Sequence, residues 1–200
     1  MGNLRVWLRA LSYKKARIAR LIPGLLVPHV IQPSPSRRYS QKPTEGNKPT
    51  RSPVDTTGIS LSARIQQVEG IISYKFTTPS LCEEALETAG YRTPSGNRSL
   101  AQVGDAALKV SLVLAGRARG DSRVDIQTVC DQTASNSFLS ARGFKHGLDK
   151  HLILNPSQRG IVAPSVMATS VEAILGAVFL DSGYDYLVFD RVRKSLGITH

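Results

Sequence analysis

The stretch that most constrains the fold is residues 98–119, which read RSLAQVGDAALKVSLVLAGRAR. If this stretch is a helix of 3.6 residues per turn, its apolar side chains form two separate stripes. A helix that is apolar on two sides is expected at the centre of a helical domain. One stripe holds Leu100, Val103, Ala107, Val110 and Leu114, and the other holds Ala101, Asp105, Leu108 and Leu112.

Asp105 is the charged member of the second stripe, which is otherwise apolar. An unpaired carboxylate on a dry helix face is unfavourable, so Asp105 needs a cation, a cluster of donors or a proton. The segment MATSVEAILGAVFL raises the same question, because Glu172 shares a helical stripe with Ala168, Gly176 and Phe179. The structural alternatives stay open: Asp105 could cap its helix, and Glu172 could pair with a basic residue of another helix.

A metal ion would explain both carboxylates at once. Two carboxylates that face each other repel unless something positive lies between them. Mg²⁺ is a hard cation that takes carboxylates and water as ligands, which makes it the natural candidate. We therefore treat Asp105 and Glu172 as candidate ligands of Mg²⁺.

The basic charge of the chain is concentrated at its N-terminus. The net charge is +11, but residues 1–39 carry eight of the basic residues and no acid, which leaves only +3 for the rest. The total therefore does not predict RNA binding by the folded part. No run approaches the roughly 18 apolar residues that a transmembrane helix needs, so no membrane span is expected.

The N-terminal segment has the pattern of a targeting sequence. Apolar residues recur at helical spacing among arginines and lysines, as in a mitochondrial presequence, and RRYS at residues 37–40 resembles a processing site. We expect a presequence at 1–39, a mitochondrial matrix location, and a disordered linker rich in Pro, Ser and Thr at 40–58. The alternative for 1–39 is a basic amphipathic helix that lies on a membrane or binds RNA.

Residues 59–200 are expected to form one all-α domain, because apolar residues recur at helical spacing and no alternating strand pair is visible. Loops are expected at 91–97 and 155–165. Helices are expected within 59–76, 79–90, 98–119, 124–147, 167–183 and 184–196, and 124–147 contains one or two of them.

Four segments, in this order, resemble the ribonuclease III catalytic domain over about residues 65–183. VEGIISYKFTTPSLCEEAL resembles the family's first helix, G-Y-x-F turn and L-L-x-x-A-L segment, and NRSLAQVGDAAL resembles the signature N-E-x-L-E-F-L-G-D-A-V-L. Ser135 and Asn136 stand where the family has S-N. ATSVEAILGAVFLDSG resembles A-D-x-x-E-A-L-I-G-A-x-Y-L-D-x-G.

This resemblance implies a helical dimer that cuts both strands of double-stranded RNA, with four acidic residues per site that bind Mg²⁺. In such a site two metal ions activate a water and stabilise the leaving oxygen. The family's signature Asp corresponds to Asp105 and its late essential Glu to Glu172, so the resemblance makes them the candidate catalytic residues. We expect a short form, without the double-stranded-RNA-binding domain that many members carry.

The chain departs from the family at the other acidic positions. Ala101 replaces the second signature Glu and Thr169 replaces the Asp that precedes the late Glu, so the acidic charge of the site falls from −4 to −2. Ala101 and Asp105 are spaced i, i+4, and Thr169 and Glu172 are spaced i, i+3. Each pair shares a helix face, so the four positions are still predicted to form one cluster. Two metal ions about 3.5–4 Å apart would repel each other with less compensation. Arg98 replaces the first signature Glu, and Gln102 replaces an aromatic residue of the dimer contact.

Two further sets of residues bear on function. Phosphate contact by exposed basic residues gives non-specific RNA affinity, and the alternative for such residues is a solvated surface. The acids that could compensate for the lost ligands are Glu87, Asp121, Asp125 and Asp131, which we expect to be surface charges. The candidate phosphate contacts are Arg117, Arg119, Arg123, Arg142 and Lys145.

Three hypotheses follow. The first is a ribonuclease III-like protein of RNA processing that binds or cleaves structured double-stranded RNA in mitochondria. The second is a non-catalytic structural protein of the mitochondrial large ribosomal subunit, which fits the lost acids. The third is a subunit of a heterodimer that contributes half a site. A homodimer is the family's usual assembly.

Overall fold

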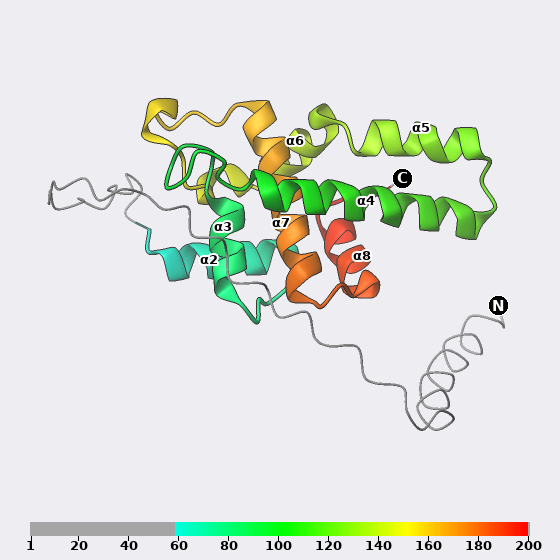
Figure 1. Cartoon of the computed structure of the whole chain (residues 1–200), viewed down its shortest axis with the longest axis horizontal. Helices are drawn as coiled ribbons and strands as arrows, with labels where there is room; N and C mark the ends of the chain where they lie inside the picture. Colours follow the sequence, from blue (N-terminus) through cyan, green and yellow to red (C-terminus); the bar gives the residue numbers. More distant parts are fainter. Residues whose placement is uncertain (1–58, 200) are drawn as a thin grey trace, which may run out of the picture. The chain divides into compact units, whose positions relative to one another are not determined.

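The computed structural model describes residues 59–199, and these residues form helices with one isolated bridge and no strand (Figure 1). The all-α prediction is confirmed. The predicted presequence and linker lie outside the described residues. The elements are α2 (Leu61–Ile72), α3 (Pro79–Leu86), α4 (Arg98–Arg119), α5 (Arg123–Thr133), α6 (Asn136–Lys145), η1 (Leu148–His151), η2 (Pro156–Gln158), α7 (Pro164–Asp181) and α8 (Tyr186–Ser195).

Helix boundaries follow local signals where such signals exist. The helix α4 has the predicted ends, and it stops at Gly120, whose left-handed backbone (φ 82°) suits a residue without a side chain. By contrast, α3 ends at Leu86 and not at Gly90 as expected. Thr88 donates a backbone hydrogen bond to the carbonyl of Ile153 (3.0 Å), and Ile153 donates to that of Leu86 (2.8 Å). These long-range bonds replace the last turn of the expected helix.

The helix α7 begins three residues earlier than predicted, at Pro164, which occupies the first turn. Proline is well tolerated there because that position needs no backbone donor. Most residues of α7 are buried, so it is the central helix of the described domain. Both α4 and α7 are long and apolar enough to cross a membrane by length and composition, and roughly half of each is buried inside this fold.

The helices α4 and α7 cross in backbone contact (Figure 1). A Cβ atom added to Gly104 would collide with the carbonyl oxygen of Glu172, and one added to Gly176 would collide with that of Leu100. Both glycines are therefore required by the close approach of the two helices. This crossing places Asp105 of α4 beside Glu172 of α7.

The first apolar stripe of α4 is not covered along its whole length, which corrects our expectation. Leu100 is buried, but the side chains of Val110 and Leu114 are 56% and 45% exposed. Figure 1 shows why: the second half of α4 runs on beside α5, beyond the other helices. The second apolar stripe of α4 is the buried one, because Leu108 and Leu112 are packed in the core.

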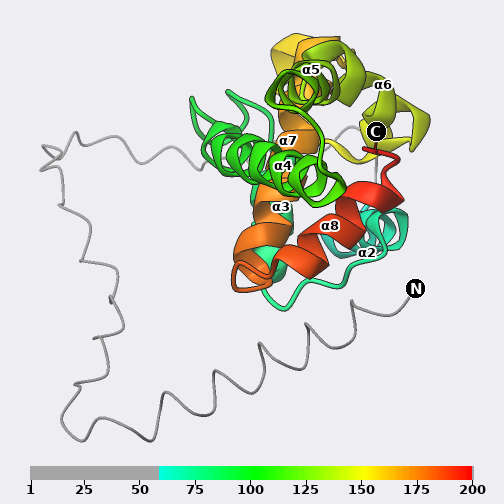
Figure 2. The same ribbon diagram turned by 90° about the vertical axis from the view of Figure 1, so that its right-hand side faces the viewer.

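A buried arginine holds α8 against α4. Arg193 of α8 donates from Nε to the Ser111 hydroxyl of α4 (2.7 Å) and from a terminal nitrogen to the Ile198 carbonyl (2.7 Å). Its other terminal nitrogen pairs with Asp190 (2.6 Å). Because these bonds satisfy a guanidinium that is 2% exposed, they fix the position of α8 along α4 (Figure 2).

Candidate functional site

The four positions predicted to cluster do meet. They line one open cavity of about 340 Å³ between α4 and α7. The local reason is the helix period, which puts Ala101 and Asp105 on one face of α4 and Thr169 and Glu172 on one face of α7. The glycine crossing then brings the two faces together. The lining residues are Arg98, Ala101, Gln102, Asp105, Thr169 and Glu172.

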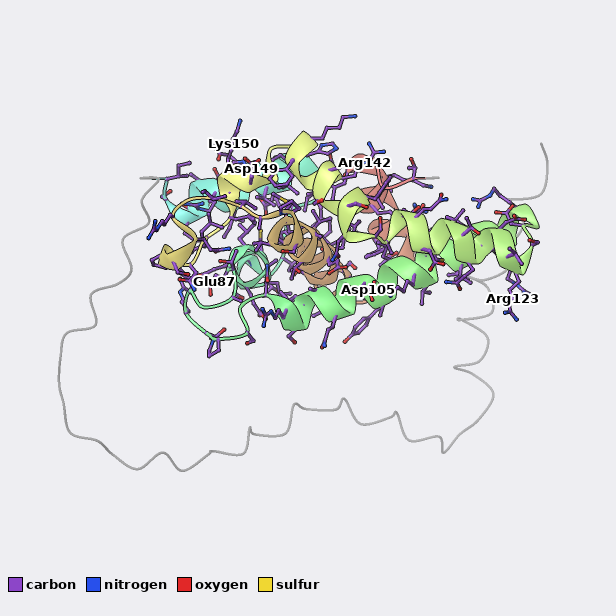
Figure 3. All side chains as sticks on the ribbon, turned by 90° about the horizontal axis from the view of Figure 1, so that it is seen from above. Glu87, Asp105, Arg123, Arg142, Asp149 and Lys150 are labelled. Carbon is purple, nitrogen blue, oxygen red and sulfur yellow. The ribbon has the colours of Figure 1, made fainter. Side chains whose placement is uncertain are left out.

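Asp105 has a cationic partner within its own helix. The Lys109 ammonium lies 2.8 Å from Asp105 Oδ2, in an i, i+4 ion pair. The Asp105 side chain is 34% exposed, so it is less dry than the sequence suggested. The helical stripes alone did not indicate Lys109, although its spacing from Asp105, D-x-x-x-K, is visible in the sequence and typical of such pairs. Figure 3 shows the place of Asp105 in the first half of α4.

Glu172 is the more perturbed carboxyl group. Its pKa is raised from the ordinary 4.5 to about 7, first because it is partly buried and second because the Asp105 carboxylate is near. The Lys109 ammonium acts in the opposite direction. In turn, the pKa of Lys109 is raised, chiefly by its hydrogen bond to Asp105, against a smaller effect of burial. The two carboxyl groups and the ammonium therefore form one electrostatic unit.

Replacing Glu172 by glutamine is expected to stabilise the protein at pH 8 by about 1–2 kcal/mol, allowing for solvent screening. The pKa of Glu172 is higher in the folded than in the unfolded chain, so folding takes up a proton between about pH 4.5 and 7. Its contribution is therefore favourable below that range and is lost as pH rises through 7. Urea unfolding from pH 5 to 8, without divalent cations, measures this loss.

Glu84→Gln is the matched control, because Glu84 is an exposed glutamate on α3. We expect Glu84→Gln to keep the pH dependence of the wild-type protein, while Glu172→Gln flattens it. Equal pH dependence in wild type and Glu172→Gln would contradict the raised pKa of Glu172.

The acids proposed as replacements for the missing ligands lie elsewhere. Glu87 pairs with Arg92 (2.7 Å) and stands well apart from the cavity (Figure 3). Asp121 pairs with the arginine two residues before it. Asp125 and Asp131 lie on α5. Asp125 accepts a hydrogen bond from the Ser122 hydroxyl, and Asp131 accepts one from the Gln127 side chain. None of these acids lines the cavity, so its carboxylates remain two.

The side chains present do not fit a pair of magnesium ions. Among residues 59–199, no group of three or more Asp, Glu, His or Cys side chains could hold a metal ion. Ala101 offers no ligand, and Thr169 offers only a neutral hydroxyl. The Asp105 carboxylate is already paired with the Lys109 ammonium. When both carboxyl groups are ionised, Arg98 and Lys109 balance them, and the formal charge around the cavity is zero. A two-metal site needs a strongly negative cluster.

Asp181, the aspartate of the L-D-S-G segment, has a structural role. Its carboxylate accepts hydrogen bonds from the Tyr74 hydroxyl (2.7 Å) and from the backbone of Thr77 and Thr78 (both 2.8 Å). Burial raises its pKa, but these donors outweigh burial, and the net pKa is lowered. Asp181 therefore anchors the loop between α2 and α3 and lies outside the cavity.

A second, apolar hollow lies next to the cavity. This groove has a volume of about 590 Å³ and is walled by α4, the end of α7 and α8. Gln102 belongs to both hollows, and it occupies the position at which the family resemblance implies a dimer contact. We call it the α4–α8 groove, and its lining residues are Ser99, Gln102, Val103, Ala106, Ala107, Val110, Leu114, Phe179, Tyr184, Tyr186 and Phe189.

The exposed arginines at the end of α4 and the start of α5 form a basic tip. Arg117 and Arg123 have no ionic partner among residues 59–199, whereas Arg119 bonds through Nε to Asp121 (3.0 Å). Arg142 lies apart from this tip on α6, where its guanidinium stacks over Phe138 at 4.7 Å (Figure 3). The basic residues considered from the sequence therefore belong to two separate places.

Comparison with known structures agrees with this fold. The nuclease domain of ribonuclease III from Campylobacter jejuni, which has a structurally flexible region involved in dimer formation, superposes with a TM-score of 0.61. That match has 19% identity and covers 66% of this chain and 95% of the other. The fold is therefore that of a ribonuclease III nuclease domain.

Sequence comparisons identify the same domain over part of the chain. Residues 98–183 match the ribonuclease III domain. Ribonuclease 3 of Oleidesulfovibrio alaskensis is 31% identical over 60% of this chain and 56% of its own length. Ribonuclease 3 of Shewanella sediminis is 32% identical over 57% of this chain and 52% of its own length. Residues 98–183 therefore form a region similar to the ribonuclease III domain, and the chain spans about half the length of these curated relatives.

Proposed function

We propose that this protein binds structured, double-stranded RNA as a ribonuclease III-like domain and does not itself hydrolyse RNA at the Asp105–Glu172 cavity. The family supports a role in RNA processing. The observation that carries the proposal is the composition of the cavity, which lies where the family resemblance implies a catalytic site. It holds two carboxylates in place of four, and the ammonium of Lys109 pairs with one of them.

The absence of hydrolysis follows from charge. Divalent ions bind such a site because several carboxylates together compensate for the water that the ions lose and for the repulsion between the ions. Around this cavity Arg98 and Lys109 cancel the charges of Asp105 and Glu172. The pair of metal ions that would activate water and stabilise a leaving oxygen is therefore not held.

RNA binding is assigned to the basic tip. Arg117 and Arg123 project from the far end of the α4–α5 pair, and neither is neutralised by an acid among the described residues. Arg98, which is exposed and lines the cavity, adds a third cation. Contacts of this kind are made to phosphates and carry no sequence preference. The protein should therefore select duplex RNA by shape and charge.

The double substitution Arg117→Ala/Arg123→Ala is expected to weaken binding to a long duplex RNA by about tenfold. It should also lower the slope of log affinity against log salt by about 1.5–2, because two phosphate contacts disappear. Fluorescence anisotropy over a series of KCl concentrations measures both quantities. Arg191→Ala, which removes an exposed arginine of α8, is the matched control and should change neither.

The same RNA, incubated with the protein and Mg²⁺, tests the absence of hydrolysis. We expect the RNA to remain intact. Cleavage that disappears in both Asp105→Asn and Glu172→Gln would establish these residues as catalytic and overturn this part of the proposal. Failure to bind duplex RNA at low salt would overturn the other part.

We further propose that a second ribonuclease III-like domain covers the α4–α8 groove. Val110 and Leu114 leave apolar surface in contact with solvent on a groove of about 590 Å³. Exposed apolar patches of this kind favour association. A second copy of this chain would bury the groove through a two-fold axis, in which each groove contacts the other. A different chain of the same fold would make a heterodimer in which this protein contributes half a site.

The second candidate function is a structural protein of the mitochondrial large ribosomal subunit. The neutral cavity favours it, because a scaffold needs the fold and its RNA contacts but no metal site. The targeting pattern of residues 1–39 and a location in the mitochondrial matrix belong to this same proposal. Recovery of the protein with the large subunit after sedimentation of a mitochondrial lysate would favour this candidate over a free RNA-processing factor.

A further inference from the structure

A lysine is paired with one of the two carboxylates of the cavity. Lys109 lies one helical turn after Asp105, and its ammonium is 2.8 Å from Asp105 Oδ2. The Lys109 side chain is 55% exposed, so its charge reaches Asp105 from the solvent side of the cavity. Glu172 lines the same cavity from α7, whose backbone touches that of α4 at Gly104. Among the described residues, Lys109 is the cation that pairs directly with the Asp105 carboxylate.

We propose that Lys109 is a built-in counter-ion that takes the electrostatic place of a metal ion, and that it excludes divalent cations from the Asp105–Glu172 cavity. A divalent ion beside Asp105 would have to displace the ammonium and then remain close to its positive charge. At such short distances this repulsion persists even in an environment as polar as water. Arg98 adds to the repulsion from the other end of the cavity.

The proposal predicts a gain of binding when Lys109 is removed. In Lys109→Gln, Asp105 loses its ammonium partner while both carboxylates and the Thr169 hydroxyl remain around the cavity. We expect the variant to bind Mn²⁺, a spectroscopic probe for the Mg²⁺ class of cations, more than about tenfold more tightly than wild type. Electron paramagnetic resonance of free Mn²⁺ titrated with the full-length protein measures this difference. The substitution Asp105→Asn on top of Lys109→Gln should abolish the gain.

The chain offers a close control for this experiment. Lys194 forms the same i, i+4 pair with Asp190 (2.6 Å), and its side chain is also 55% exposed. Lys194→Gln therefore removes a lysine from an ion pair of the same spacing outside the cavity, where Asp190 keeps Arg193 as a second partner, and it should leave Mn²⁺ binding at the wild-type level. Exposed pairs contribute little to stability, so both variants should remain folded, as circular dichroism can verify. Lys109→Met repeats the test without a polar side chain.

Three results would overturn the proposal. Wild-type protein could bind Mn²⁺ as tightly as Lys109→Gln, in a manner that requires Asp105. Folded Lys109→Gln and Lys109→Met could both gain no binding. The gain could also be equal in Lys194→Gln, which would make it a general effect of lost positive charge.

The inference extends the proposed function, since both treat the cavity as free of metal ions. Mn²⁺ binding is measured without RNA, however, so a protein that failed to bind duplex RNA would leave the role of Lys109 untouched.

Discussion

Replacing Gly176 by alanine is expected to destabilise the protein by about 3 kcal/mol or more, or to prevent its folding. The added methyl group would collide with the carbonyl oxygen of Leu100 and lie 3.0 Å from the backbone nitrogen of Gly104. Both neighbours are backbone atoms, which cannot move aside as the end of a side chain can. Relief requires α4 and α7 to separate, and that separation opens the main helix contact of the core.

Gly70→Ala is the matched control. Gly70 lies inside α2, and a Cβ atom there would have nothing within 4 Å. This substitution should therefore be neutral or should stabilise the helix by about 0.5–1 kcal/mol, as alanine does in open helical positions. Urea unfolding of both variants gives the comparison. A Gly176→Ala protein with the unfolding midpoint of the wild type would show that the two helices do not cross in backbone contact.

Val110→Glu is expected to weaken self-association of the protein by more than about a hundredfold. Val110 is 56% exposed in the isolated domain and lines the α4–α8 groove. In a two-fold dimer each substitution occurs twice, so two carboxylates would be buried at the interface without partners. Sedimentation equilibrium should give twice 21.7 kDa for the wild-type chain and 21.7 kDa for the variant.

Val124→Glu provides the matched control, because Val124 is a 72% exposed valine on α5 that does not line the groove. It should leave the dimer intact. A wild-type chain that is monomeric at tens of micromolar would rule out a second copy and leave the groove for a different ribonuclease III-like chain. Equal loss of association in both variants would mean that the groove is not the contact surface.

The helices could be predicted where the signals are local. The extent of α4 follows from its apolar period and from Gly120, both of which lie within the segment itself. The end of α3 could not be predicted in the same way. Its last turn is replaced by backbone hydrogen bonds to Ile153, which lies far along the chain. Whether such a segment continues as a helix or bonds to a distant segment is decided only when that distant segment lies beside it.

The candidate site could be predicted in part. The helix period and the family motifs together placed Asp105 and Glu172 in one cavity, because each pair of positions needs only one helical turn. The spacing of Lys109 from Asp105 was equally visible, but spacing alone does not say whether the lysine turns toward the carboxylate or into solvent. Whether either acid acts in catalysis remains a prediction that the cleavage experiment tests.

The sequence by itself determined the all-α class, the ends of α4, the family motifs and the loss of two acidic side chains, since these depend on residue identity and on spacings within a turn or two. Only the tertiary structure decided which stripe of α4 is buried, that α4 and α7 touch at Gly104 and Gly176, and that two basic residues lie beside the two carboxyl groups of the cavity. The physical reason is that burial and net charge at a point depend on which distant segments arrive there. An apolar stripe looks the same in the sequence whether α7 covers it or solvent does.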